Sequence, residues 1–253
     1  MGKKGKRKNR NPDYWGLARQ PLPCLVFLLP LLVVYETGVT TLGSSGNEAI
    51  RNGADFWMRS AIERAAPGHA YLLPALVVTI LLLWHVAGRY SWKISRDTMF
   101  GMFGESVLFA FVLLLIGRVH DLAFEDMQLT MAAAGETIPV ARRAITFVGA
   151  GVYEEVLFRL GLLPVAYAVF RLMRLGRIQA SVLAVLLSSV FFAGAHYIGP
   201  TADELTLFSF TFRAMAGMFF AGLFVVRGFG ITVGCHAMYD LLVGVILLVP
   251  DVA

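Results

Sequence analysis

The sequence GVYEEVLFRLGLLP, residues 151–164, carries three charges inside a run that is otherwise apolar. The surrounding hydrophobic segment, residues 144–170, is long enough to cross the roughly 30 Å hydrocarbon core of a bilayer as a helix. Charged side chains at that depth are costly, and by default they mark a functional site. The stretch therefore predicts a membrane helix that carries a functional site. The candidate residues are Glu154, Glu155 and Arg159.

The composition of the whole chain also indicates a membrane protein. Of its 253 residues 57% are hydrophobic and 15% are charged, whereas a soluble domain carries about 25% charged residues. The apolar residues fall into runs of membrane-spanning length, which predict an all-α, polytopic helical bundle with about seven transmembrane helices. An eighth span or a re-entrant piece within residues 120–143 stays open. The seven segments are residues 22–41, 71–88, 103–119, 144–170, 179–197, 206–226 and 230–249.

Residues 47–66 show a different pattern. Apolar residues recur there at helical spacing with charged residues between them, which is typical of an amphipathic helix lying in the membrane interface. No soluble domain and no repeat is visible, so residues 21–253 are expected to form a single membrane domain behind a basic tail, residues 1–20. The apolar positions are Ile50, Ala54, Trp57, Met58 and Ala61, and the charged ones are Arg51, Asp55, Arg59 and Glu63.

The basic residues are concentrated on one predicted side of the membrane. The first eleven residues, MGKKGKRKNRN, contain six basic side chains and no acidic one. Beside a hydrophobic segment such a tail predicts contact with anionic lipid, and no nucleic-acid partner is expected. The positive-inside rule then predicts a cytoplasmic N-terminus and a C-terminus on the other side. The other basic residues of this side are Arg89, Lys93, Arg96, Arg171, Arg174, Arg177 and Arg227.

Helical angles separate the three charges of residues 151–164. At 3.6 residues per turn, Glu155 and Arg159 lie one turn and about 40° apart, which predicts an i,i+4 ion pair. Glu154 points about 100° away from Glu155 and is left facing another surface. A structural pair needs only one glutamate, so the second buried carboxyl must be satisfied in another way. Glu154 is therefore the candidate for proton transfer.

Two further spans carry ionisable residues that can share a cavity with Glu154. Phe192 and His196 lie one turn apart, and His236 and Asp240 are likewise four residues apart on one helical face. At 1.5 Å per residue, Glu154 and His236 lie about 16 and 13 Å from the arginines that bound their spans, so their depths agree. His196 comes out nearly a full bilayer from Arg177, and this difference in depth stays open.

The remaining polar residues of the spans have simpler interpretations. Glu36, Glu105 and His85 lie near span ends or basic loops, so we expect their side chains to reach water. Two cysteines, Cys24 and Cys235, are too few for a disulfide framework and are expected to be small buried apolar residues.

Three motifs occur in order on separate hydrophobic spans: EEVLFR (154–159), FAGAH (192–196) and HAMYD (236–240). In order and spacing they resemble the EExxxR, FxxxH and HxxxN or HxxxD motifs of one family. This is the CAAX-protease and bacteriocin-processing family of intramembrane endopeptidases, also called the CPBP or ABI family, which is related to the type II CAAX prenyl proteases. The resemblance covers residues 144–245 as an expected catalytic core, and it does not extend to the N-terminal hundred residues.

The resemblance implies an endopeptidase that hydrolyses a peptide bond in a membrane-associated protein or peptide. Glu154 would activate the water, with His196 and His236 positioned around it. Asp240 stands where many relatives have an asparagine that is credited with stabilising the oxyanion. An ionised aspartate cannot donate that hydrogen bond, so Asp240 is expected to orient His236 or to be protonated. The supporting residues are Glu155, Arg159 and Phe192.

Whether the reaction needs a metal stays open at this point. Glu154, His196, His236 and Asp240 offer donors that can hold zinc with an open position for water, whereas a glutamate base needs no cofactor. No HExxH motif is present, and the metal-free mechanism is favoured here. The short, arginine-rich chain resembles bacterial members of the family, which implies a multi-pass protein of the bacterial inner (plasma) membrane. A CAAX substrate is not assigned.

Three other functions compete with this one. A rhomboid-type serine protease would need Ser45, within GSSG at 43–46, at the start of a membrane-embedded helix, but the serine follows the first span. A proton-coupled transporter would predict inverted repeats with interrupted helices in both halves, and no matching pair is visible. A non-catalytic, peptide-binding scaffold of the same fold remains an alternative.

Overall fold

The computed structural model describes residues 13–42, 50–124, 139–199 and 202–247. Within these residues all regular secondary structure is helical, which confirms the predicted all-α class. Two expectations fall outside them, namely the lipid contact of the basic run before residue 13 and the turn with Ser45. Of residues 120–143, where an eighth span or a re-entrant piece stayed open, residues 125–138 also lie outside the described ranges.

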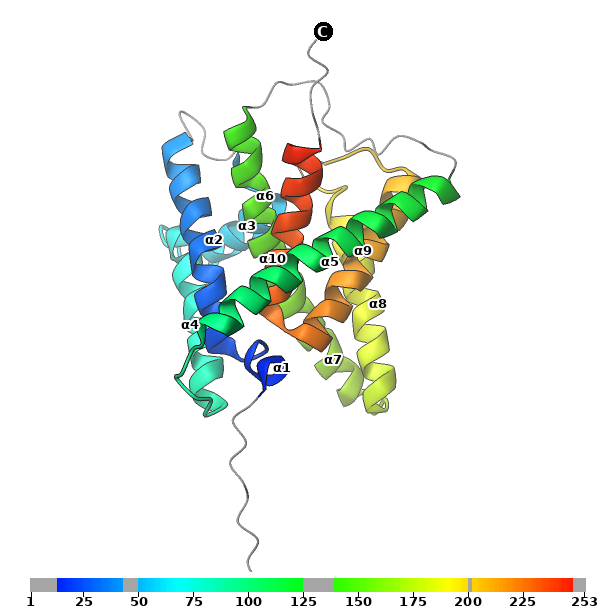
Figure 1. The fold of residues 1–253 in the computed structure, drawn as a ribbon. Helices are drawn as coiled ribbons and strands as arrows, with labels where there is room; N and C mark the ends of the chain where they lie inside the picture. The colour runs from blue at the N-terminus through cyan, green and yellow to red at the C-terminus, as the bar shows by residue number, and fades with distance from the viewer. Residues whose placement is uncertain (1–12, 43–49, 125–138, 200–201, 248–253) are drawn as a thin grey trace, which may run out of the picture.

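The helices account for the predicted spans (Figure 1). By length and composition, six helical runs of the described residues can cross a membrane, namely Pro21–Leu42, Ala70–Ala87, Arg96–Ala123, Arg177–Ala195, Leu207–Arg227 and Phe229–Ile246. The seventh predicted span is the unbroken run α6, η3 and α7. The elements are α1 (Tyr14–Leu17), α2 (Pro21–Leu42), α3 (Gly53–Ala65), η2 (Ala70–Leu72), α4 (Leu73–Ala87), α5 (Arg96–Ala123), α6 (Val140–Glu155), η3 (Val156–Leu162), α7 (Leu163–Leu172), α8 (Arg177–Ala195), α9 (Leu207–Arg227), α10 (Phe229–Leu241) and η4 (Leu242–Ile246).

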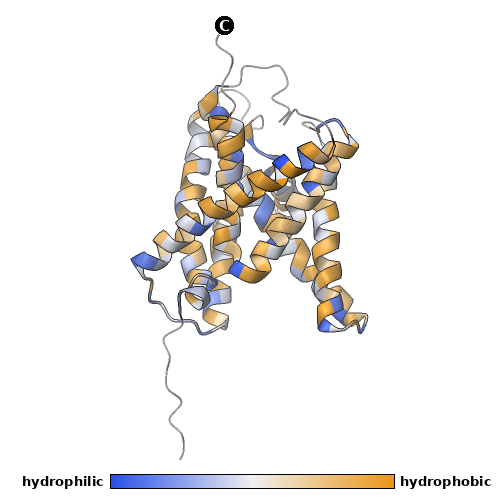
Figure 2. Ribbon diagram, turned by 45° about the vertical axis from the view of Figure 1, so that its right-hand side comes forward, coloured by the Kyte–Doolittle hydropathy of each residue, from blue (hydrophilic) through white to orange (hydrophobic). Residues whose placement is uncertain are grey.

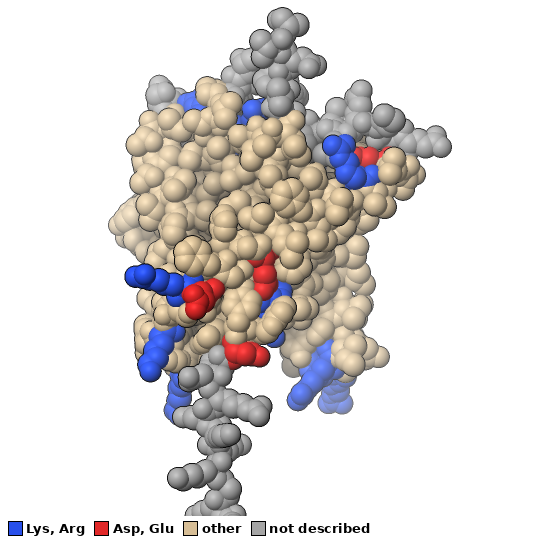
Figure 3. All heavy atoms as spheres, viewed as in Figure 1, with Lys and Arg blue, Asp and Glu red and all other residues tan. Residues whose placement is uncertain are grey.

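The bundle presents an apolar surface between two more polar ends. Successive spans run up and down in alternation in Figure 1, so the first and last described helices, α1 and η4, lie at opposite ends. Figure 2 shows hydrophobic residues along the outward faces of the helices. In the view of Figure 3, charged side chains gather toward the two ends, with Lys and Arg prominent at the lower one. This distribution is that of an integral, multi-pass membrane protein.

Helix α10 forms the centre of the bundle. Its residues from Phe229 to Ala237 are all buried, and it packs against α2, α5, α6 and α9. Figure 1 shows α5 crossing obliquely in front of it. Both cysteines are buried and free, as predicted, with Cys235 on α10 and Cys24 on α2.

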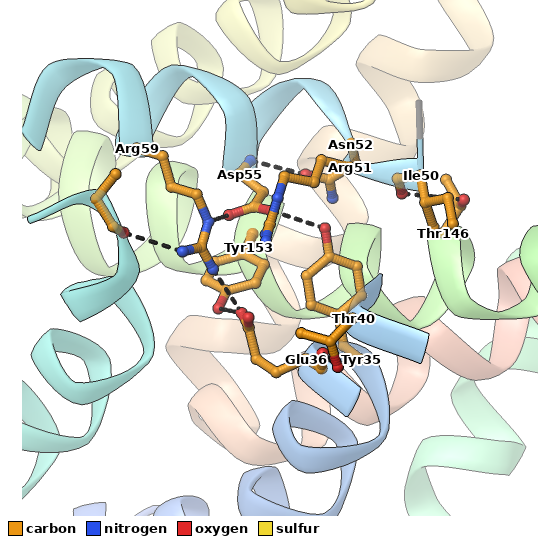
Figure 4. A network of polar contacts seen from close by, with 11 residues as sticks. Tyr35, Glu36, Thr40, Ile50, Arg51, Asn52, Asp55, Arg59, Thr146 and Tyr153 are labelled. Atoms are coloured by element: carbon orange, nitrogen blue, oxygen red, sulfur yellow. Dashed lines mark hydrogen bonds and ion pairs between the residues drawn. The ribbon is translucent and has the colours of Figure 1, made fainter. Parts of the chain in front are cut away.

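Helix α3 forms where the amphipathic segment was predicted, but three charged residues of the segment, Arg51, Asp55 and Arg59, face the bundle (Figure 4). The Asp55 carboxylate is fully buried and pairs with Arg51 and Arg59, each at 2.6 Å. It also accepts a hydrogen bond from the Tyr35 hydroxyl of α2 at 2.8 Å. Charges at i,i+4 thus neutralise one another. This part of the predicted interfacial segment can therefore pack its charged side chains against α2 and α6.

The expectation that Glu36, Glu105 and His85 reach water is wrong for His85, whereas the two glutamate side chains are 24% and 16% exposed and also pair with arginines. Glu36 pairs with Arg59 at 2.7 Å and accepts a hydrogen bond from Tyr153 of α6. Glu105 accepts two hydrogen bonds from Arg227, at 2.6 and 2.7 Å, and His85 is fully buried. Each glutamate has an arginine partner from a distant part of the chain, which a single span cannot reveal.

Helices α6 and α10 are in close backbone contact at Gly151. A Cβ atom at this position would lie 2.6 Å from the backbone nitrogen of Ala237 and 2.8 Å from its Cα atom. Only glycine therefore allows the two helices to touch here. Gly151 lies one turn before Glu154 and Glu155, and Ala237 directly follows His236, so this contact sets the distance between the first and third motifs.

We expect Gly151→Ala to destabilise the protein by about 1–3 kcal/mol, because the new methyl group meets backbone that cannot move without displacing a helix. The thermal unfolding midpoint in detergent measures this effect. Gly104→Ala on α5 is the control, since nothing lies within 4 Å of its new Cβ atom, and helix propensity predicts a neutral or slightly stabilising change. Equal unfolding midpoints for the two variants would contradict the close contact.

Candidate active site

The first motif lies where α6 changes its helical geometry. Glu154 and Glu155 end α6, and Arg159 lies in the π-helical segment η3, Val156–Leu162. π-Helical turns are rare and occur often at functional sites. A second π segment, η4, begins two residues after Asp240. Both acidic motifs therefore border helical segments whose widened backbone departs from the regular α-helix.

Glu155 is a fully buried carboxylate that joins two helices. Its Oε2 atom lies 3.0 Å from Nε of Arg159, so the predicted ion pair is present, and both side chains are 0% exposed. Its Oε1 atom lies 2.8 Å from Nδ1 of His236 on α10. An ionised carboxylate can only accept hydrogen bonds, so Nδ1 of His236 carries a proton and donates it. Glu155 thus fixes the orientation of the His236 ring.

Aromatic rings and one backbone carbonyl enclose the guanidinium of Arg159. The ring of Phe192 lies 4.7 Å from its central carbon, and the ring of Phe220 lies 5.6 Å away. Nη2 of Arg159 donates a hydrogen bond to the carbonyl oxygen of Gly217 on α9 at 3.2 Å. Cation–π contacts of this kind are worth more when they are desolvated. Arg159 therefore holds α6, α8 and α9 together and has no access to solvent.

Glu154 faces away from the arginine and toward the two histidines. Its Oε2 atom lies 3.8 Å from Nε2 of His236 and 3.9 Å from Nε2 of His196. Within the described part of the chain this oxygen is buried and accepts no hydrogen bond. The side chain is 13% exposed, in contrast to the closed Glu155. The structure thus brings one carboxylate and two imidazoles from three helices to a single point.

The imidazole rings of His196 and His236 each form a hydrogen bond through Nδ1, which leaves Nε2 available on both. Nδ1 of His196 lies 2.9 Å from the carbonyl oxygen of Phe192, one turn earlier on α8. A carbonyl can only accept, so Nδ1 of His196 also carries the proton. In the neutral imidazole the remaining Nε2 atom is a hydrogen-bond acceptor. With both rings neutral, both Nε2 atoms face Glu154 as acceptors.

Asp240 lies beside this group as the sequence order suggests. Its Oδ2 atom is 3.5 Å from Nε2 of His236, one turn earlier on α10. The side chain is only 15% exposed. The carboxylate is thus close enough to act on the imidazole, although no short hydrogen bond joins the two.

The difference in depth predicted for His196 came from a wrong reference point. Arg227 is 2% exposed and pairs with Glu105 inside the bundle, so it does not mark the membrane boundary. In Figure 1 the α7–α8 hairpin extends further down than the connection between α9 and α10. Helix α8 therefore starts lower than α10, and its last turn reaches the level of His236.

Helix α9 adds two residues that the sequence analysis did not single out. The ring of Phe220 stacks on that of His236, with centroids 4.4 Å apart and planes at 18°. Arg213 lies on the same helical face, since positions 213, 217 and 220 are spaced by four and three residues. A charge inside the span 206–226 was the available signal, and applying the rule used for Glu154 to Arg213 would have found it.

The donor types of the site include common zinc ligands, since carboxylates and imidazoles bind zinc at about 2.0–2.2 Å. Across the described residues, no group of three or more His, Cys, Asp and Glu side chains is arranged as a ready metal site. Glu154, His196 and His236 are the residues that would hold a zinc ion.

Comparison with known proteins identifies the segment that builds this site. Residues 136–242 match the model of one family, described as type II CAAX prenyl endopeptidase Rce1-like. The match includes all three motifs. Searches of curated proteins and of solved structures gave no match. The segment that carries the site is therefore similar to this family of CAAX-type endopeptidases, in agreement with the motifs.

Proposed function

We propose that the protein is an intramembrane endopeptidase in which Glu154 is the general base. The observation that carries this proposal is the convergence of Nε2 of His196 and Nε2 of His236 on one oxygen of Glu154, at 3.9 and 3.8 Å. A water molecule beside that oxygen can donate one hydrogen bond to the carboxylate and one to either ring. The family match supports a peptidase.

The geometry suits a two-step hydrolysis. Glu154 takes a proton from the water, and the resulting hydroxide attacks the carbonyl carbon of the scissile peptide bond. The tetrahedral intermediate then collapses, the C–N bond breaks, and Glu154 returns its proton to the leaving amine. His236 keeps its orientation throughout because Glu155 holds Nδ1 and Phe220 covers the ring. His196 is held in the same way through the carbonyl oxygen of Phe192.

The substrate that fits this site is a peptide segment at or within the membrane. The described bundle is apolar outside, and the groups of the site lie on its central helices. We propose a membrane-associated protein or peptide as partner, with anionic lipid at the basic N-terminal tail. The basic residues at the lower end in Figure 3 favour the cytoplasmic side for that end and for the N-terminus. A bacterial plasma membrane fits the short, arginine-rich chain.

Glu154→Gln is expected to lower the cleavage rate by about 10²- to 10⁴-fold, because the amide cannot accept the proton of the water. Cells that express the wild type and the variant are compared by mass spectrometry of new termini in membrane proteins. Fold is checked by the thermal unfolding midpoint, which is expected to stay near that of the wild type. Ser45→Ala should retain wild-type cleavage. Cleavage that persists with Glu154→Gln would overturn the assignment.

Arg159→Met is expected to destabilise the protein by about 3–5 kcal/mol, because it leaves the buried carboxylate of Glu155 unpaired. The double variant Glu155→Leu/Arg159→Met removes both charges and should recover much of this loss. Its cleavage activity should remain low, since His236 then loses its Nδ1 acceptor. Thermal unfolding and the termini assay measure the two effects separately. A double variant with full activity would show that Glu155 does not position His236.

A base without a metal predicts activity that survives metal removal. The purified protein is expected to contain substoichiometric zinc by mass spectrometry of the elements, and incubation with a chelator should leave cleavage unchanged. Restoration by added Zn²⁺ after a loss in chelator would instead place a metal at Glu154, His196 and His236. The control is Glu154→Gln, whose inactivity should not depend on metal in either case.

A further inference from the structure

The guanidinium of Arg213 lies at the edge of the site with donor capacity to spare. Its Nη2 atom donates a hydrogen bond to the carboxylate of Asp203. The central carbon of the guanidinium lies over the ring of Tyr197, 5.1 Å from the ring centroid. Nη1 of the same group is buried and has no hydrogen-bond partner among the described residues. A buried, charged N–H group without a partner is costly, so this nitrogen is a candidate for contact with a substrate.

Arg213 belongs to the face of α9 that builds the site. Gly217, one turn further along, accepts the hydrogen bond of Arg159, and Phe220 stacks on His236. Spacings of four and three residues place Arg213 on the same face as both. The backbone N–H of Asp203 also donates to the carbonyl oxygen of His196 at 2.9 Å. Arg213 is thus linked through its ion-pair partner to one of the two histidines.

The ring of His236 is surrounded by carboxylates. Glu154, Glu155 and Asp240 lie 3.8, 2.8 and 3.5 Å from its nitrogen atoms. A negative charge that develops on a peptide carbonyl beside them needs a nearby cation or donor. Asp240 in its ionised form cannot donate a hydrogen bond to it.

Of the two arginines near the site, only Arg213 can reach a substrate. Arg159 is 0% exposed, paired with Glu155 and enclosed by aromatic rings. The side chain of Arg213 is 22% exposed, and that of Asp203 is 37% exposed. The Arg213–Asp203 pair is therefore the more accessible of the two arginine pairs.

From this geometry we infer that Arg213 is a catalytic residue whose Nη1–H group donates a hydrogen bond to the oxyanion of the tetrahedral intermediate. When the hydroxide oxygen bonds to the carbonyl carbon, the electron pair of the C=O π bond moves to the carbonyl oxygen. Arg213 stabilises that charge and keeps its own protons. On collapse the pair reforms the π bond, and the C–N electron pair leaves with the amine, which takes its proton from Glu154.

This inference rests on the proposed function, so its test begins from a wild-type protein that cleaves. The probe is a quenched fluorescent peptide that spans a cleavage site mapped by the termini assay. Absence of any wild-type cleavage would refute the endopeptidase itself. With a cleaving wild type, the variants of Arg213 test the donor alone.

Arg213→Gln is expected to lower kcat by about 10²- to 10³-fold with little change in KM, as removal of one oxyanion donor does. Asp203→Asn is the matched control, because it removes the ion-pair partner and leaves the guanidinium in place. This control should retain most of the wild-type kcat. Arg213→Lys keeps the charge and should recover part of the loss. Equal losses in Arg213→Gln and Asp203→Asn would reduce Arg213 to a structural role and overturn the inference.

A binding measurement separates the donor from a general electrostatic effect. In the inactive Glu154→Gln background, a peptide with a phosphinate at the scissile position mimics the charged intermediate, and the uncleaved amide peptide is its neutral counterpart. Adding Arg213→Gln should weaken phosphinate binding about 100-fold and amide binding little, since transition-state interactions are the stronger ones. Equal effects on the two ligands would contradict the inference. The binding measurement gives this result even for a variant that unfolds too readily for a kinetic assay.

Discussion

The arrangement of the site depends on one buried carboxylate. Glu155 pairs with Arg159 at 3.0 Å and accepts a hydrogen bond from His236 at 2.8 Å. All three side chains are buried. Charges buried in this way persist only when each has a partner, because an unpaired ion costs several kcal/mol. Since the partners lie on α6, η3 and α10, the pairing fixes how these segments are rotated. That rotation in turn leaves Glu154 facing the two histidines.

The same principle organises the N-terminal half. Three carboxylates there form ion pairs with arginines. Asp55 pairs within its own helix, whereas Glu36 and Glu105 pair with arginines of other helices. The Tyr153 hydroxyl donates to Glu36, and Tyr153 directly precedes Glu154 in the chain, so the α2–α3 network also supports the helix that carries the proposed general base. The motif-free part of the chain thus contributes to positioning the site.

The sequence predicted those features that depend on neighbours along one helix. The angle between Glu154 and Glu155, the i,i+4 pair with Arg159, and the order of the three motifs all follow from helical spacing and a family resemblance. It did not predict the features that depend on distant parts of the chain. The partner of Glu36, the burial of His85 and the depth of Arg227 are set by contacts between helices. The membrane depth of His196, counted along its own span, therefore did not match that of Glu154 and His236.

The π-helical segment η3 has a consequence for how the chain tolerates length changes. A π turn holds one residue more than the α turn it replaces, so it is the structural equivalent of a single-residue insertion. Removing one residue of Val156–Leu162 would therefore return the segment to a regular α-helix and leave α7 at nearly its present rotation against α6. A deletion within the regular turns of α6 or α7 would instead rotate the residues on its two sides by about 100° relative to one another. The π-helical segment is thus the place in this long helix where the loss of one residue disturbs the neighbouring turns least.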